Sequence, residues 1–329
     1  MAILAVMEEI VQIPDTFIEA HTDFNSLVGA LRNAFAQAEV MVPMRHHHDF
    51  PNPAVGSEST LLLMPAWNPS KEAGVKIVTV SPDNGQFDLP SIQGTYIYLD
   101  AVKGQVRALL EAKSLTAKRT AATSALASSY LSRPDASSML MIGTGALSAN
   151  LILAHAAVRP IKKVYVWGRS LEKAQAICNQ LTHLDLELKA IEDRFSVMPE
   201  VDIIASATLS KEPLVLGEYL REGQHIDLVG AYRKDMRESD DACIEKATVF
   251  VDTYQGGLKE SGDIVIPLRE GKLKESDVKA DLFGLCSGKH KGRSSASEIT
   301  YFKSVGHALE DLTAAGYYFD KYTCQVSKT

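Results

Sequence analysis

The amino-acid sequence predicts an α/β protein: a Rossmann-type, doubly wound parallel sheet together with a discontinuous α+β domain. Three observations predict this class. Short apolar strands alternate with helical stretches after residue 138, which is the pattern of βαβ units on a parallel sheet. A glycine-rich turn follows the first of these strands, and residues 1–128 have a different, mixed pattern. The 329 residues are enough for about two domains.

The first 128 residues mix helix and strand signals. Asp23–Gln37 has apolar residues at helical spacing and predicts an amphipathic helix. Four apolar runs separated by turn-forming residues predict strands: Val40–Met44, Ser59–Ala66, Val75–Ser81 and Gly94–Asp100. Ser114–Ser132 is rich in good helix formers and predicts a helix that Pro134 ends.

The alternating region predicts a parallel sheet. Its expected strands are Met139–Ile142, Lys163–Trp167, Ile203–Ala205, His225–Val229 and Thr248–Val251, with helices starting near Ala146, Ser170, Leu216 and Ser239. A last strand, Ile299–Phe302, and a long helix from Val305 to Tyr318 are where we expect the chain to return to the first domain. The predicted domains are therefore residues 1–128 with 300–329, and residues 129–299.

The sharpest motif is the turn after the first of these strands, which reads GxGxxS. A glycine at Gly143 permits the tight turn, Gly145 lets the backbone approach a diphosphate, and the small Ser148 lets helix and strand pack closely. The helix that follows offers unpaired N–H groups to the phosphates. We therefore expect a dinucleotide at the residues Gly143, Thr144, Gly145, Ala146 and Leu147.

The end of the second strand indicates which dinucleotide. An NAD site usually has an acidic residue there for the ribose 2′-hydroxyl, but this chain has Arg169 and Ser170. Arginine and a hydroxyl would bind a 2′-phosphate, so these residues favour NADP(H), with NAD as the alternative. The plainer alternative is that Arg169 is a solvated loop residue.

Three cations of the first domain fall near predicted strand ends or helix starts: Arg45, Lys76 and Arg119. From the sequence alone, Arg45 and Arg119 are better explained as surface charges than as ligands. Lys76 shares a strand face with Val78 and Val80, so its side chain is expected to point inward, where a lysine needs a partner such as a bound carboxylate.

Composition excludes several classes of protein. Asp and Glu outnumber Lys and Arg by 41 to 34, giving a formal net charge of −7, so a duplex-binding protein is not expected. The four cysteines form no CxxC pair, which fits a reduced, cytoplasmic protein. The N-terminus lacks a basic region before Glu8 and Glu9, and the apolar window Met139–Val158 contains the glycine-rich turn, so neither a signal peptide nor a membrane span is expected.

The remaining polar features have plainer interpretations. His46, His47 and His48 resemble a metal cluster, but only alternate residues of a strand share a face, and we expect no metal there. Glu310 and Asp311 lie in the last predicted helix and are expected in packing or surface roles.

Several segments together resemble the ornithine cyclodeaminase/mu-crystallin family. They are Arg45, Leu63–Pro65, Gly74–Lys76, Arg119–Ser124, Gly143–Ala146 and Lys303–Gly306, which occur in order over nearly the whole chain. The family includes ornithine and lysine cyclodeaminases, archaeal-type alanine dehydrogenases, ketimine reductases and Δ1-pyrroline-2-carboxylate reductases. The resemblance implies a homodimer formed through the discontinuous, substrate-binding domain, beside a Rossmann domain.

The resemblance also implies roles for single residues. Arg45, Lys76 and Arg119 would hold the substrate α-carboxylate, and Lys76 could also relay a proton to the substrate. Residues near the cofactor would be Thr120, Thr123, Ala207, Thr208, Val229, Gly230, Ser304, Val305 and Gly306.

Two departures from the family pattern favour its reductase branch. Leu62 stands where cyclodeaminases carry a glutamate, and Tyr232 stands where they carry a catalytic aspartate. We therefore expect NADPH-preferring reduction of a small cyclic imine, Δ1-pyrroline-2-carboxylate to L-proline or Δ1-piperideine-2-carboxylate to L-pipecolate. The alternatives are cyclodeaminase or alanine dehydrogenase activity, or a non-catalytic binding protein.

Overall fold

A computed structural model of the chain describes residues 10–326, and the predicted absence of a signal peptide concerns residues outside that range. The chain divides into two compact units. The first holds the described residues up to Asp23, Ala38–Arg119, and those from Ala308 onward; the second holds Phe24–Gln37 and Thr120–His307. One helix, α3 (Ala112–Leu131), contributes residues to both units.

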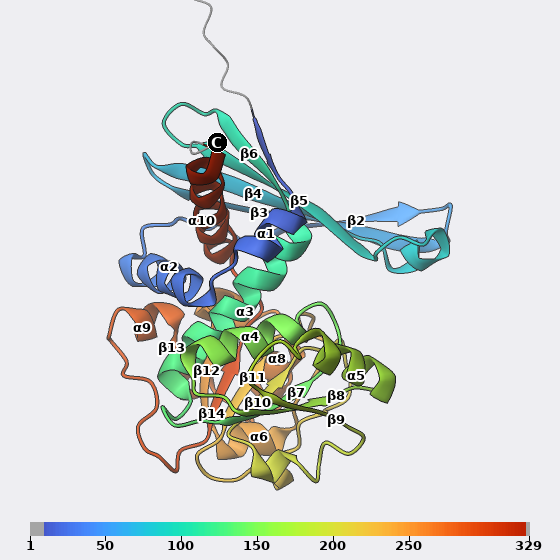
Figure 1. Ribbon diagram of the computed structural model, residues 1–329, viewed down its shortest axis with the longest axis vertical. Coiled ribbons are helices and arrows are strands. Elements are labelled where there is room, and N and C mark those ends of the chain that lie inside the picture. The colour runs from blue at the N-terminus through green and yellow to red at the C-terminus, as the bar shows by residue number, and fades with distance from the viewer. Residues whose placement is uncertain (1–9, 327–329) are drawn as a thin grey trace, which may run out of the picture. The chain divides into compact units, whose positions relative to one another are not determined.

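The first unit is built on a six-stranded sheet with the order β1-β6-β5-β4-β3-β2 (Figure 1). Its strands are β1 (Val11–Ile13), β2 (His46–Asn52), β3 (Ser57–Asn68), β4 (Glu72–Val80), β5 (Ile92–Asp100) and β6 (Val106–Glu111). Only β1 and β6 pair in parallel; the others are antiparallel neighbours. The unit also contains α1 (Asp15–His21), the 3-10 helix η1 (Pro82–Phe87) and α10 (Ala308–Val326).

Helix α10 packs along β3, β4 and β5. Its apolar side chains Leu309, Leu312 and Phe319 are buried there, as is Met64 of β3. Burial of such an apolar stripe is the main force that holds a helix on a sheet. The same helix face carries two acidic residues, which matter for the site below.

The second unit contains an eight-stranded, all-parallel sheet with the order β13-β12-β14-β11-β10-β7-β8-β9. Its strands are β7 (Ser138–Ile142), β8 (Lys163–Trp167), β9 (Glu187–Ile191), β10 (Ile203–Ser206), β11 (His225–Leu228), β12 (Thr248–Val251), β13 (Val278–Asp281) and β14 (Thr300–Lys303). Strand order reverses between β7 and β10, and ligands of doubly wound sheets bind outside the carboxyl ends of the strands at such a point.

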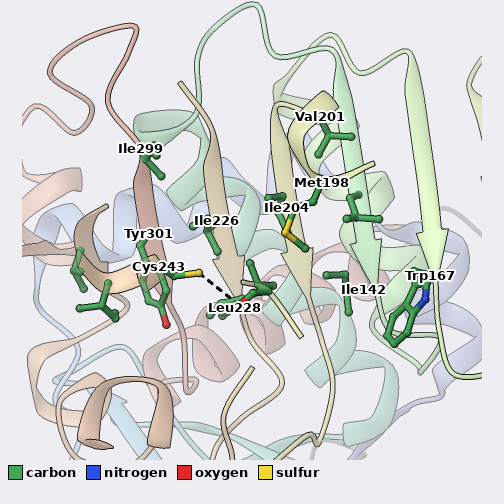
Figure 2. Packing of buried hydrophobic residues seen from close by; sticks show 14 of the residues in the cluster. Ile142, Trp167, Met198, Val201, Ile204, Ile226, Leu228, Cys243, Ile299 and Tyr301 are labelled. Atoms are coloured by element: carbon green, nitrogen blue, oxygen red, sulfur yellow. Dashed lines mark hydrogen bonds between the residues drawn. The ribbon is translucent and has the colours of Figure 1, made fainter. Parts of the chain in front are cut away.

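The second unit also contains helices, most of which connect these strands. They are α2 (Phe24–Gln37), α4 (Ser148–Val158), α5 (Leu171–Gln180), α6 (Asp241–Lys246), α7 (Tyr254–Gly257), α8 (Gly262–Arg269), α9 (Leu282–Cys286), and the 3-10 helices η2 (Met198–Glu200), η3 (Gly217–Tyr219) and η4 (Glu275–Asp277). Alternate strand residues such as Ile142, Ile204, Leu228 and Tyr301 form one buried apolar face (Figure 2). The fold class predicted from the sequence is confirmed.

Some predicted elements differ from the structure. Val40–Met44 forms no strand beyond a single bridge between Met41 and Trp67, and the strand follows at β2 instead. The helix expected from Leu216 is only the short η3, and α10 starts at Ala308 rather than Val305. Pro43 lacks the N–H that a strand ladder needs, and the segment after Leu216 is short and mixed in character.

The bounds of the two compact units differ from those of the predicted domains. The sequence placed the return to the first domain at residue 300, but β14 pairs with β11 and β12 inside the parallel sheet. A strand of four fully buried residues is stable there because both faces are covered. Residues 24–37 also belong to the second unit, where Phe35 packs edge-on against Phe283. Within residues 10–326, no helix is long and apolar enough to cross a bilayer.

Candidate active site

The glycine-rich turn joins β7 to α4. Gly143 has a φ of +119°, a conformation that side-chain-bearing residues rarely adopt, and a Cβ there would lie 2.7 Å from the Ala207 carbonyl oxygen. Ser148 closes the turn because its Oγ donates to the Gly143 carbonyl at 2.9 Å. Gly143 therefore allows the loops after β7 and β10 to lie in direct contact.

Gly145 has a different role in this turn. It is exposed, and a Cβ at its position would meet no atom within 4 Å. The backbone thus leaves an open cradle beside the N-terminus of α4, the end of a helix that carries partial positive charge and favours anions. The residues of this turn fit the diphosphate of a dinucleotide, since a side chain at residue 145 would fill the space that a phosphate needs.

The loop after β8 lies against the same turn. A Cβ at Gly168 would be 2.6 Å from Thr144 Cγ2, so the two loops touch. Arg169 is exposed next to this contact. The Ser170 hydroxyl accepts a hydrogen bond from the Lys173 amide at 3.3 Å and caps helix α5. The structure thus gives Ser170 a structural partner that the sequence did not predict.

Three further loops complete the carboxyl edge of the sheet. A Cβ at Gly230 would lie 2.0 Å from the Thr208 amide nitrogen, so the loops after β10 and β11 are in close contact. Asp252, which follows β12, accepts from the Val305 and Gly306 amides at 2.6 and 2.8 Å and holds the loop after β14. The predicted cofactor residues Ala207, Thr208, Val229, Gly230 and Val305 all lie in these loops, while Thr120 and Thr123 are buried in α3.

A buried cluster of charges lies in the first unit. The inward orientation predicted for Lys76 is confirmed: its Nζ is 2.8 Å from Asp311 Oδ1 and the side chain is fully buried. Arg119 binds the same carboxylate oxygen through Nε at 2.9 Å and Glu310 Oε2 through Nη1 at 2.5 Å. Gly74 makes room for this arrangement, because a Cβ there would overlap the buried ring of Tyr96.

Electrostatics link Arg45 to this cluster. Burial, the charge of Arg119 and, to a smaller extent, that of Arg45 lower the pKa of Lys76 to about 8, against the opposing effect of Asp311. Burial alone would raise the pKa of Asp311, but Arg119 and Lys76, with a contribution from Arg45, hold it below its usual value. Lys76 and Arg119 are therefore buried and paired with Asp311 and Glu310, and the half-buried Arg45 adds positive charge to the same cluster.

The acidic half of the cluster was missed from the sequence. Glu310 and Asp311 were expected in packing or surface roles. The surface role is wrong, and packing alone does not describe them, because they form ion pairs. Both side chains are fully buried and paired with the cations. One sequence feature could have indicated their burial. They lie between the apolar Leu309 and Leu312, which places them beside the buried stripe of the helix.

Other sequence features have simpler positions. Leu62 lies in β3 opposite Val78 of β4, and Tyr232 lies in the loop after β11. His46 and His48 are exposed on β2, with ring centroids 6.2 Å apart. Within the described residues, no group of three His, Cys, Asp or Glu side chains is placed to hold a metal ion.

Comparison with known proteins assigns the family. The model of the ornithine cyclodeaminase/mu-crystallin family matches residues 9–325. The chain belongs to this family. An uncharacterized protein of Schizosaccharomyces pombe is 44% identical over 299 residues, covering 88% of this chain and 90% of that protein. The Δ1-pyrroline-2-carboxylate reductase of Paracoccus denitrificans is 36% identical over 259 residues, covering 78% and 82% of the two chains.

A solved structure shows that the similarity extends to the fold over nearly the whole chain. The Thermococcus litoralis Δ1-pyrroline-2-carboxylate reductase, in complex with NADH and L-proline, superposes with a TM-score of 0.89 at 31% identity. The match covers 96% of this chain and 98% of that one. The resemblance stated from the sequence motifs is therefore confirmed over nearly the full length.

Proposed function

We propose that this family member is an NADPH-preferring reductase of Δ1-pyrroline-2-carboxylate, with L-proline as its product. The observation that carries the proposal is the cationic cluster, in which Arg45 adds positive charge to the buried Lys76 and Arg119 and so suits one substrate carboxylate. The similarity to reductases of this substrate, at 36% and 31% identity, supports the same reaction. The six-membered homologue, Δ1-piperideine-2-carboxylate, carries the same imine and carboxylate and is proposed as a second substrate.

The reaction adds a hydride to the C=N carbon and a proton to the nitrogen. A bound nicotinamide cofactor supplies the hydride. Arg45 and Arg119 hold the carboxylate, and Lys76 completes the anion site and passes a proton toward the imine nitrogen. A pKa of about 8 suits Lys76 to proton transfer near neutral pH. Asp311 and Glu310 keep the cations in position by direct ion pairs.

Two positions disfavour the cyclodeaminase alternative. Cyclisation of ornithine needs groups that handle the δ-amine and its proton. The chain places the apolar Leu62 and the phenol of Tyr232 where cyclodeaminases carry carboxylates. An imine substrate needs neither carboxylate, because a protonated imine is already electrophilic.

The preference for NADPH is proposed from Arg169. Its exposed guanidinium next to the phosphate turn is suited to a 2′-phosphate, and the first turn of α5 adds Lys173 nearby. Replacement by aspartate, Arg169→Asp, should lower the ratio of kcat/KM for NADPH over NADH at least about tenfold, about 1.4 kcal/mol. Lys189→Asp makes the same charge change at an exposed position of β9 and should leave the ratio unchanged. An equal drop in both variants would show a general charge effect instead.

The reaction itself is tested by initial rates of NADPH and NADH oxidation with Δ1-pyrroline-2-carboxylate. A parallel reaction contains L-ornithine and NAD. Fast imine reduction with no ammonia release from ornithine is the expected result. Ammonia and proline from ornithine would overturn the argument from Leu62 and Tyr232. Cofactor binding without turnover in either reaction would favour a binding protein.

We further propose a homodimer formed through the first unit, as the family resemblance implies, and a cytoplasmic location. The four cysteines, Cys178, Cys243, Cys286 and Cys324, form no disulfide, which suits a reducing compartment. Sedimentation of the purified protein tests the dimer.

A further inference from the structure

Glu238 lies between β11 and α6 and is fully buried, although no predicted role was attached to it. One carboxylate oxygen, Oε1, accepts three hydrogen bonds from the end of β10 and the loop after it. The donors are Ser206 Oγ at 2.6 Å, the Thr208 amide at 2.7 Å and Thr208 Oγ1 at 2.9 Å. This oxygen therefore fixes both the backbone and the side chain of the β10 loop.

The second oxygen of Glu238 holds the neighbouring loop. Oε2 accepts from the Gly230 amide at 2.7 Å and from the Ala231 amide at 3.0 Å. One carboxylate thus bridges the loops after β10 and β11. The three backbone N–H groups that Glu238 binds can only donate. The side chain at residue 238 must therefore accept at both of its terminal atoms, which a carboxylate does.

The position of Glu238 is itself fixed by charge and backbone contacts. Lys303 Nζ lies 3.7 Å from its Oε2 and 3.0 Å from Asp263 Oδ2, and both lysine and carboxylates are fully buried. Asp263 Oδ1 also accepts from the Glu238 amide at 2.7 Å. A buried carboxylate with this many partners is a rigid support, because each lost partner would leave a desolvated polar group.

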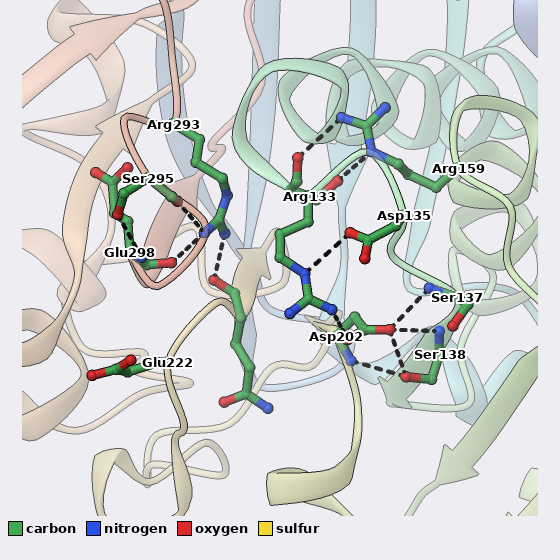
Figure 3. A network of polar contacts seen from close by, with 12 residues as sticks. Arg133, Asp135, Ser137, Ser138, Arg159, Asp202, Glu222, Arg293, Ser295 and Glu298 are labelled. Carbon is green, nitrogen blue, oxygen red and sulfur yellow. Dashed lines mark hydrogen bonds and ion pairs between the residues drawn. The ribbon is translucent and has the colours of Figure 1, made fainter.

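The bridge lies at one end of the sheet only. Glu238 acts at the carboxyl ends of β10 and β11, beside the point where the strand order reverses and where doubly wound sheets bind their ligands. Asp202 has matching chemistry at the opposite end: its Oδ2 accepts from the Ser137 and Ser138 amides and from Ser138 Oγ at 2.9, 3.1 and 2.9 Å (Figure 3). Asp202 is therefore a matched carboxylate that binds backbone and hydroxyl groups away from the carboxyl edge of the sheet.

We propose that Glu238 is a positioning residue for the cofactor: it holds the loops after β10 and β11 in the conformation that receives the nicotinamide half. This inference rests on the proposed function, which places Thr208, Val229 and Gly230 against the cofactor. Because the Thr208, Gly230 and Ala231 amides bind Glu238, these loops meet the cofactor through their other groups. Glu238 acts through the loops and does not itself touch the reacting atoms.

The test compares Glu238→Gln with Asp202→Asn in the full-length protein. Glutamine keeps the size of the side chain but turns one acceptor oxygen into a donor, so one loop loses its anchor. We expect the Kd for NADPH, measured by nucleotide fluorescence, to rise at least about tenfold in Glu238→Gln. Amide hydrogen exchange in the cofactor-free protein should also accelerate at residues 207–210 and 229–232. In Asp202→Asn the same readouts should stay within about twofold of wild type, even where the melting temperature falls.

A milder variant keeps the inference testable if Glu238→Gln does not fold. Ser206→Ala removes one donor to Oε1 and leaves the other contacts in place. It should raise the Kd for NADPH by about two- to fivefold and accelerate exchange in the β10 loop only.

Three results would overturn the inference. The first is an unchanged Kd in Glu238→Gln and Ser206→Ala. The second is an equal rise in Asp202→Asn, which would show that general destabilisation is the cause. The third is wild-type protein that binds neither NADPH nor NADH. This result would overturn the proposed function as well, and cofactor binding by the wild-type protein alone distinguishes it from the first two.

Discussion

The burial of Lys76 could be predicted from the sequence, but its ion-pair partner could not. Its position among alternating apolar residues indicated an inward side chain, and the structure buries it. Its partner came from Asp311, which lies 235 residues further along the chain, and strand periodicity carries no information about such a partner. A helical acidic residue is normally solvated, so only the fold could show that this one is an internal counter-ion.

The lowered pKa of Lys76 has two consequences with pH. Its value of about 8 in the folded protein lies below the ordinary 10.5, so between these values the unfolded chain binds more protons and stability rises with pH. Below about pH 8 the lysine is charged in both the folded and the unfolded state, so its effect on stability changes only between about pH 8 and 10.5. For an anionic ligand the direction is opposite, because the positive charge that attracts it disappears as pH rises.

We therefore expect binding of pyrrole-2-carboxylate, an analogue that does not titrate in this range, to weaken as pH rises through about 8. In Lys76→Arg the guanidinium stays charged, and the decline should disappear. The measurement is the inhibition constant against pH at saturating NADPH for both proteins. The same decline in the arginine variant would show that another group controls binding.

The Asp311 carboxylate should be among the most costly side chains to remove from the first unit. Asp311→Asn leaves Lys76 and Arg119 buried without their shared counter-ion, so we expect the free energy of unfolding to fall by about 3–5 kcal/mol. Asp320→Asn makes the same change at an exposed position of the same helix and should cost less than about 0.5 kcal/mol. Urea denaturation of the two variants provides the comparison. Similar midpoints would mean that the buried ion pairs contribute little.

At the scale of elements, the central strands could be predicted and the edge strands could not. The apolar runs of β7, β8, β10, β11 and β12 are buried on both faces and gave continuous signals. All four edge strands, β1, β2, β9 and β13, were missed or misplaced, and so was β6. The edge strands β2 and β9 are partly solvated, β2 being exposed and β9 alternating, so their sequences resemble loops.

The glycine-rich turn between β7 and α4 could be located from the sequence because its glycines have backbone reasons to be there. These reasons differ between Gly143 and Gly145, which predicts different variants. Gly143→Ala forces a methyl group toward the Ala207 carbonyl at a positive φ, so both stability and NADPH binding should fall. Gly145→Ala meets no atom of the protein, so stability should stay within about 0.5 kcal/mol while the Kd for NADPH rises at least about tenfold. Thermal melting and fluorescence titration of both variants check this. Normal NADPH binding by Gly145→Ala would place the diphosphate elsewhere.

At the scale of the whole molecule, chain order and spatial units do not coincide. Helix α2 lies early in the sequence but belongs to the second unit, where it contacts α4 and α9. Helix α10 closes the chain and belongs to the first unit, where it brings Asp311 to Lys76. Motifs could be located from the sequence because each is local. The exact bounds of the units could not, because they depend on contacts between distant segments.

This division predicts that the two sets of candidate residues act separately on binding. The cationic cluster belongs to the first unit, and the five loops at the sheet edge belong to the second. Lys76→Met should therefore raise the KM for the imine at least about tenfold and leave the Kd for NADPH, measured without imine, within about twofold. Gly145→Ala should do the reverse, and in the double variant the change in Kd should equal that of Gly145→Ala alone, because mutations without shared partners add. A coupling larger than about 0.5 kcal/mol in the Kd for NADPH would show that the cluster and the loops form one cooperative site even before the substrate binds.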